Sequence, residues 1–190
     1  MKLRLRVLVP VVLVMALLMP GVARPARAQE KLQPHAGSVA IGGNIGFWIP
    51  DEHFNFAFTP DGLVEIYVTH NLSVRGMVGW TRPSFVDGGR DLDQWRGLVS
   101  LGWNWETGLW HPFILGGIGI VSVQYTVGDG DPVGSRIQQH TIHGGAGVEY
   151  FAKPKVTFKF EVRYDWSKPI PDIEASPSGL ALSVGIKKYF

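Results

Sequence analysis

The sequence has no cysteine in its 190 residues, so it can form neither disulfide bonds nor zinc–thiolate sites. After residue 28 it has no run of about eighteen apolar residues, which excludes a transmembrane helix from that part of the chain. Helical periodicity is nearly absent, whereas glycines and aromatic residues are abundant. If such a chain enters a membrane, it must do so as a closed β-barrel, because only closure satisfies every backbone group in lipid.

The first 28 residues have the pattern of a secretory signal peptide. A basic start is followed by the apolar run 7–18, about a dozen residues and too short for a helix to cross a bilayer of roughly 30 Å. Ala26-Arg27-Ala28 then matches the A-x-A cleavage pattern, so the sequence predicts cleavage before Gln29. The remainder is expected to comprise a short periplasmic segment, 29–37, and one barrel domain, 38–190.

Removal of the signal peptide also changes the charge. That segment holds five basic and no acidic residues, so losing it turns the formal net charge from +2 into −3. No basic patch remains in the exported chain, and a nucleic-acid partner is therefore not expected.

The mature chain alternates between apolar and polar residues in short segments. The clearest segment is 156–166, where one parity is apolar and the other is mostly charged. Successive side chains on a strand point to opposite faces, so this strand has an apolar face and a charged face. A soluble barrel would turn its apolar face inward, whereas a membrane barrel turns it outward to lipid.

Eight strands are expected, at about 38–49, 63–69, 72–81, 95–105, 112–127, 137–151, 156–166 and 179–190. Short links alternate with long links over 50–62, 82–94, 128–136 and 167–178, which is typical of outer-membrane barrels. The predicted fold is therefore an all-β, eight-stranded, antiparallel up-and-down transmembrane barrel with both termini in the periplasm. In the segment 113–127 the alternation is weaker, and Ile114, Ile118 and Ile120 are expected on its inner face.

Aromatic residues fall near both predicted ends of the strands, as in the girdles of membrane barrels. Trp95 and Trp105 are ten residues apart, which on a tilted strand spans about 25 Å, the height of the apolar band. The predicted girdle residues are Trp80, Trp95, Trp103, Trp105, Tyr125, Tyr150 and Trp166, with Phe113 and Phe190 at the periplasmic ends.

The amino-acid sequence of the C-terminal half resembles the small outer-membrane β-barrel domain family. The resemblance is carried by PFILGGIGI at 112–120, GGAGVEYFAKPKVTFKFEVRYDW at 144–166 and the final LALSVGIKKYF. That family includes eight-stranded barrels such as the transmembrane domain of outer membrane protein A and the OmpX-like barrels. The resemblance implies a Gram-negative outer-membrane location, with outer-membrane lipids as surroundings.

The last strand also resembles the signal that the barrel-assembly machinery reads, which implies that machinery as a partner. Phe190, Ile186, Val184 and Leu182 match the alternating pattern of the signal, whereas Lys188 departs from it. At the periplasmic rim a lysine can extend its ammonium group to water, so the departure is tolerable.

No motif predicts catalysis, a cofactor or a metal. The glycine clusters lack the strand–loop–helix context of a nucleotide site, and relief of crowding in a narrow barrel explains them better. His140 and His143 are three apart and fall on opposite faces, which prevents joint metal binding. A lipid-modifying enzyme would need a serine beside His140 on the lipid face. The next residue on that face is two positions further along the strand, and it is Ile142.

Charged residues of inward parity form the remaining candidate site. They are Glu65, Arg75, Arg96, Glu149, Lys159, Glu161, Arg163 and Asp165. Eight strands leave an interior only wide enough for side chains, and buried charges persist only when paired, so a salt-bridged plug is expected. Glu65 is expected to pair with Arg75, and Glu149, across a short hairpin from the segment 156–166, with Arg163 or Lys159. Function would then be structural, or carried by the long loops binding a surface ligand. The alternatives are a narrow porin-like channel for small solutes and, less favoured, a lipid-modifying enzyme.

Overall fold

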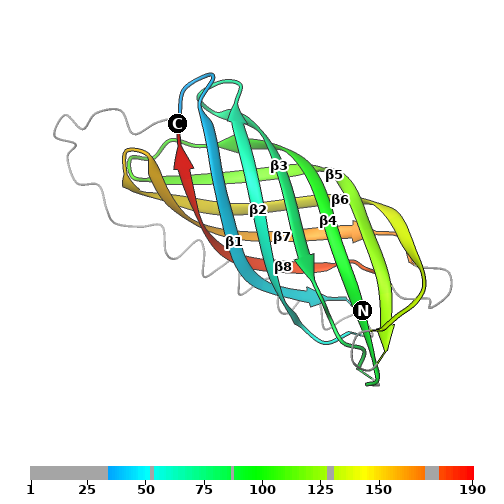
Figure 1. The fold of residues 1–190 in the computed structure, drawn as a ribbon. Helices are drawn as coiled ribbons and strands as arrows, with labels where there is room; N and C mark the ends of the chain where they lie inside the picture. The colour runs from blue at the N-terminus through cyan, green and yellow to red at the C-terminus, as the bar shows by residue number, and fades with distance from the viewer. Residues whose placement is uncertain (1–33, 52–53, 87, 128–130, 170–175) are drawn as a thin grey trace, which may run out of the picture.

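The computed structural model describes residues 34–51, 54–86, 88–127, 131–169 and 176–190. The predicted signal peptide and the first part of the segment 29–37 lie outside the described residues. The described chain forms eight antiparallel strands in one closed barrel, each hydrogen-bonded to its neighbours in sequence (Figure 1). The strands are β1 (Val39–Pro50), β2 (Ala57–Tyr67), β3 (Leu72–Thr81), β4 (Arg90–Asn104), β5 (Trp110–Val127), β6 (Asp131–Lys153), β7 (Val156–Ser167) and β8 (Gly179–Tyr189).

Closure of the barrel comes from pairing between the first and last strands. Their register runs from Ala40 opposite Tyr189 to Pro50 opposite Gly179, so β1 begins where β8 ends. We call this end of the barrel the terminal end and the opposite end the loop end. The links at the loop end follow β1, β3, β5 and β7, as the predicted topology requires.

The faces of the strands follow the alternation in the sequence. On β7, Phe158 is 55% exposed on the outside, whereas the adjacent Lys159 is 3% exposed inside the barrel. Most large exposed apolar residues share this outward orientation, which in water would be unfavourable and in lipid is favourable. The eight-stranded antiparallel barrel that the sequence predicts is confirmed.

Three strands begin five or more residues earlier than the sequence predicts. β2 begins at Ala57 rather than 63, β4 at Arg90 rather than 95, and β6 at Asp131 rather than 137. Proline and glycine in 57–62 suggested a loop, but these residues pair with β1, and the start of β4 pairs with the end of β5. Pairing with a single neighbouring strand, which is all that most of these residues have, outweighs their weak local strand propensity, so the connections at the loop end are shorter than predicted.

The predicted inner face of β5 is wrong. Ile118 is 67% exposed, and Ile114 and Ile120 are also exposed, whereas Phe113 points into the barrel. Phe113 pairs with Asn104 on β4 and Gly147 on β6, which both face inward. The apolar residues on both faces of this strand concealed its phase in the sequence, and the register with its neighbours sets it.

Candidate functional site

Charged side chains from six strands meet inside the barrel. The structure places all eight predicted residues there, and adds Lys187 from β8; each is at most 3% exposed. We call these nine residues the lumen network: Glu65, Arg75, Arg96, Glu149, Lys159, Glu161, Arg163, Asp165 and Lys187. Asp61 on β2 interacts electrostatically with the cations of the network and accepts a hydrogen bond from Asn44. With Asp61, five cations face five carboxylates, so the interior is close to neutral.

Arg75 joins the carboxylates near the terminal end of the network. Its Nη1 lies 2.7 Å from Glu161 Oε2, and its Nη2 lies 3.2 Å from Glu65 Oε2 and 3.8 Å from Glu149 Oε1. Lys187 Nζ lies 2.6 Å from Glu65 Oε2 and also pairs with Glu149. Arg75 and Lys187 thus each have two or more carboxylate partners, which offsets the cost of removing these two cations from water.

The chain of ion pairs continues along β7 toward the loop end. Glu161 accepts from Lys159 at 2.9 Å and from Arg163 at 3.2 Å, and Arg163 Nε donates to Asp165 Oδ1 at 2.9 Å. Arg96 Nη1 lies 3.6 Å from the other oxygen of Asp165, and its guanidinium lies over the Trp48 ring at 4.4 Å. The lumen network is therefore continuous from Lys187 to Arg96.

The sequence identified most of these residues but not all of their partners. The expected Glu65–Arg75 pair is present. Glu149, expected to pair with Arg163 or Lys159, instead pairs with Arg75 and Lys187. Lys187 was missed, although its inward parity with Gly185 was the signal that could have found it.

Aromatic side chains fill the barrel at the terminal end. Tyr67, Phe151 and Tyr189 are buried together with Ala40. The Tyr189 hydroxyl donates to Glu149 Oε2 at 2.7 Å and lies 3.2 Å from the Tyr67 hydroxyl. This layer therefore connects directly to the lumen network.

An apolar cluster fills the barrel at the loop end. It consists of Phe54, Phe85, Leu92, Val121 and Val123. The centroids of the Phe54 and Phe85 rings, which come from two different links, lie 4.4 Å apart, and the rings cover the inner face of β4 and β5.

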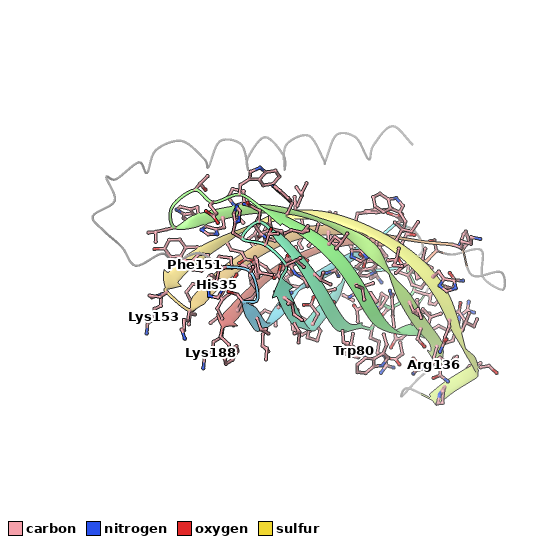
Figure 2. The ribbon with its side chains drawn as sticks, turned by 90° about the horizontal axis from the view of Figure 1, so that it is seen from above. His35, Trp80, Arg136, Phe151, Lys153 and Lys188 are labelled. Atoms are coloured by element: carbon pink, nitrogen blue, oxygen red, sulfur yellow. The ribbon has the colours of Figure 1, made fainter. Side chains whose placement is uncertain are left out.

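Figure 2 shows the two ends of the barrel. Phe151, Lys153 and Lys188 lie at the terminal end, and Trp80 and Arg136 lie toward the loop end.

A serine and a histidine also meet inside the barrel. Ser100 Oγ on β4 lies 2.7 Å from His143 Nε2 on β6, across the side-chain-free Gly117 of β5. The pair has the geometry of a nucleophile beside a base, and the sequence does not indicate it because the two residues lie 43 positions apart on different strands. Ser100 is 4% exposed and His143 2%, and neither lines a described groove.

The outward-facing predicted residues are distributed as follows. Trp95, Trp103, Trp105 and Trp166 are exposed on the outside, Trp80 and Tyr150 are half-exposed, and Trp110 adds an outward ring that was not predicted. The prediction that Tyr125 belongs to the outer girdle is wrong. Its side chain packs against the inner cluster at the loop end, because the inward and outward faces of β5 are the reverse of those predicted. Phe113 points into the barrel, so it is not part of the girdle either. The centroid of its ring lies 5.1 Å from Arg75 Cζ.

The last strand keeps its apolar pattern on the outside. Phe190, Ile186 and Val184 are exposed, and Leu182 is half-exposed. Among the described residues, no group of three His, Cys, Asp or Glu is arranged to hold a metal ion.

Comparison with known proteins gives a consistent result. Residues 13–187 match the family described as "Outer membrane protein beta-barrel domain". Among curated proteins, none is significantly similar in sequence. Solved structures with the same fold include the Neisserial surface protein A (TM-score 0.65, 16% identity, covering 82% of this chain and 97% of that one). The N-terminal barrel of Pseudomonas aeruginosa OprF also has this fold, with a TM-score of 0.62 and 12% identity over 83% of this chain and 100% of that one. Yersinia pestis Ail, the attachment invasion locus protein, is similar with a TM-score of 0.52 and 16% identity over 83% of this chain and 100% of that one.

Proposed function

Because this chain belongs to the outer membrane protein β-barrel domain family, we propose that it is a non-conducting outer-membrane barrel that binds a partner through its loop end. Both termini would lie in the periplasm, and the loop end would face the cell exterior. Catalysis and a cofactor have no part in this proposal.

The single observation that carries the proposal is the filled interior. The lumen network occupies the middle of the barrel, the Tyr67–Phe151–Tyr189 layer fills the terminal end, and the Phe54–Phe85 cluster fills the loop end. A solute would have to separate several buried ion pairs, and each separation leaves an uncompensated charge in a poorly hydrated space. An eight-stranded barrel has no spare width for a path around them.

The loop end offers a shaped surface for binding. β6 extends ten residues, 131–140, beyond the Thr141–Ser167 pair at which its pairing with β7 ends, while β5 remains paired along its length. Val127 and Val133 are exposed on this projecting hairpin. Arg136 is already paired with Asp93, and Arg82 with Asp91, which favours a protein partner over a polyanion.

Planar-bilayer recording tests the occluded interior. The purified barrel should show negligible steady conductance, whereas Arg75→Ala should produce transient openings because Glu65 and Glu161 lose a shared partner. A stable, ion-selective conductance in the wild type would instead favour the narrow channel.

Cell-surface binding tests the projecting hairpin. The name of the similar Ail, the attachment invasion locus protein, favours attachment to a cell surface. Cells expressing the barrel should therefore bind immobilised cell-surface proteins, and Val133→Asp with Arg136→Ala should reduce that binding several-fold at equal surface expression. Lys168→Ala, in another link at the loop end, is the matched control. Equal binding by both variants would remove the hairpin from the proposal.

A further inference from the structure

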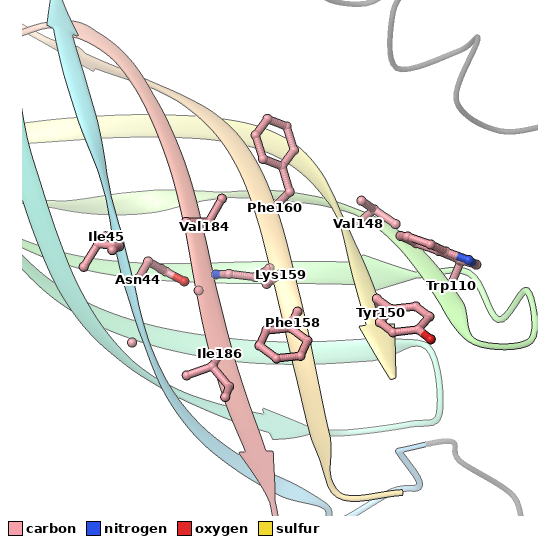
Figure 3. A pocket seen from close by; sticks show the side chains of 12 residues that line it. Asn44, Ile45, Trp110, Val148, Tyr150, Phe158, Lys159, Phe160, Val184 and Ile186 are labelled. Carbon is pink, nitrogen blue, oxygen red and sulfur yellow. The ribbon is translucent and has the colours of Figure 1, made fainter. Parts of the chain in front are cut away.

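A groove of about 810 Å³ crosses the outer wall of the barrel toward the terminal end (Figure 3). Its walls are almost entirely apolar and come from β1, β5, β6, β7 and β8. The principal wall residues are Ile45, Val148, Phe158, Phe160, Val184 and Ile186.

The depth of the groove has a simple cause in the sequence. Gly43 faces outward between the exposed Ile41 and Ile45, so the row of β1 side chains has a gap there. Gly185 on β8 faces inward and lies directly against the Asn44 side chain, since a Cβ on it would fall 2.0 Å from Asn44 Oδ1. Backbone therefore forms the floor where most of the barrel wall is covered by side chains.

Aromatic rings mark one end of the groove. Trp110 and Tyr150 line it, with ring centroids 4.8 Å apart. Tryptophan and tyrosine rings of this kind favour the boundary between acyl chains and headgroups. This end of the groove therefore lies near the membrane surface.

Three exposed lysines lie just beyond this boundary. Lys188 follows the groove residue Ile186 by two positions on the same face, and it pairs with Val156 at the start of β7. Lys153 and Lys155 flank the β6–β7 turn, three positions after Tyr150 and three positions before Phe158 along the chain. None of the three takes part in an ion pair among the described residues.

We propose that this groove and rim bind one anionic phospholipid, with an acyl chain in the groove and the phosphate on Lys153, Lys155 and Lys188. The apolar length of the groove accounts for the acyl chain, and three lysines without a carboxylate partner account for a preference for an anionic headgroup. The inference rests on the membrane location of the barrel but not on its filled interior, so the two can fail separately. An annular lipid without a site would show no such preference.

Native mass spectrometry tests the site with the intact barrel. The folded protein is released from detergent micelles that contain equal amounts of dioleoyl phosphatidylglycerol and dioleoyl phosphatidylcholine. The wild type should retain one phosphatidylglycerol in preference to phosphatidylcholine. Lys155→Gln with Lys188→Gln should lower that preference by at least tenfold, since each surface cation near a membrane contributes roughly fivefold.

A second variant separates the groove from the rim. Val184→Trp should fill the groove and reduce retention of both lipids, while Val99→Trp, an outward position outside the groove, should not. Lys168→Gln is the control for charge, and heat-dependent gel mobility checks folding of every variant. Equal retention of both lipids by the wild type, unchanged preference in the lysine variant, or a protein dimer in place of bound lipid would each overturn the proposal.

Discussion

Lys187 on β8 and Glu65 on β2 lie 122 positions apart in the chain, yet their side chains meet inside the barrel with Nζ 2.6 Å from Oε2. The strand between them is β1, and its Gly42 makes the crossing possible: a Cβ at Gly42 would lie 2.8 Å from Lys187 Cγ. Both charged side chains are fully buried. Strand order, a glycine and a long side chain together produce this contact.

Removing one member of this pair should be costly. Glu65→Gln keeps the shape of the side chain but leaves Lys187 and Arg75 short of a negative charge. We expect a loss of about 3–5 kcal/mol in the free energy of unfolding, measured by urea titration in lipid vesicles. Asp91→Asn, in the half-exposed pair with Arg82, should cost no more than about 1 kcal/mol. Adding Lys187→Met to Glu65→Gln should recover part of the loss; strict additivity would show that the two residues are not coupled.

Glycines of inward parity should be intolerant of a methyl group. At Gly117 a Cβ would lie 1.9 Å from the Val99 carbonyl oxygen, so Gly117→Ala should cost about 1–3 kcal/mol or prevent folding. Gly97 faces outward with nothing within 4 Å, and Gly97→Ala should change stability by about 0.5 kcal/mol or less. The fraction of protein with folded gel mobility reports both. Equal effects would contradict the crowded interior.

The corrected face of β5 can be tested directly. Ile118 is exposed on the outside, so Ile118→Arg should cost about 2–4 kcal/mol near the membrane midplane, while Ile118→Leu should be nearly neutral. Vesicle unfolding measures both variants. A harmless arginine at this position would place Ile118 away from lipid.

The C-terminal residue should matter for assembly more than for stability. Phe190 is exposed, and its backbone N–H donates to the Val39 carbonyl at 2.9 Å. Deleting Phe190 should leave unassembled protein in the periplasm, whereas Phe190→Tyr should assemble normally because an aromatic end is retained. Cell fractionation distinguishes them, and normal assembly of the deletion would reject the predicted signal.

Ser100 should be unreactive in the folded barrel. A fluorophosphonate probe, which labels activated serines, should not modify it, because Ser100 and His143 are enclosed by the barrel wall. Ser100→Ala should instead cost about 1–3 kcal/mol by leaving the His143 ring nitrogen without its partner. If the probe labels the folded wild type but not Ser100→Ala, the enzyme hypothesis is favoured instead.

How far the sequence predicts this structure depends on the contrast between the faces of each strand. On β7, where apolar and mostly charged residues alternate, every orientation was predicted. On β5, Phe113, Leu115, Ile118 and Ile120 are apolar on both faces, so only pairing with β4 and β6 determines the phase. Parity also selected the interior charges, but it cannot give the shear between strands. Glu149 therefore reaches Arg75 and Lys187 rather than its register partner Lys159.

Pairing between β1 and β8 also governs how the chain must fold. The first strand can pair on this side only when the last strand is in place. The residues that close the barrel, from Ala40–Tyr189 to Pro50–Gly179, are therefore separated by nearly the whole described sequence. Such non-local pairing makes folding slow, because the ends of a long loop must be brought together before the contacts stabilise it. Until then both outer edges carry unpaired backbone groups that other chains can join. We therefore expect the unclosed chain to need protection from aggregation until its last strand pairs with its first.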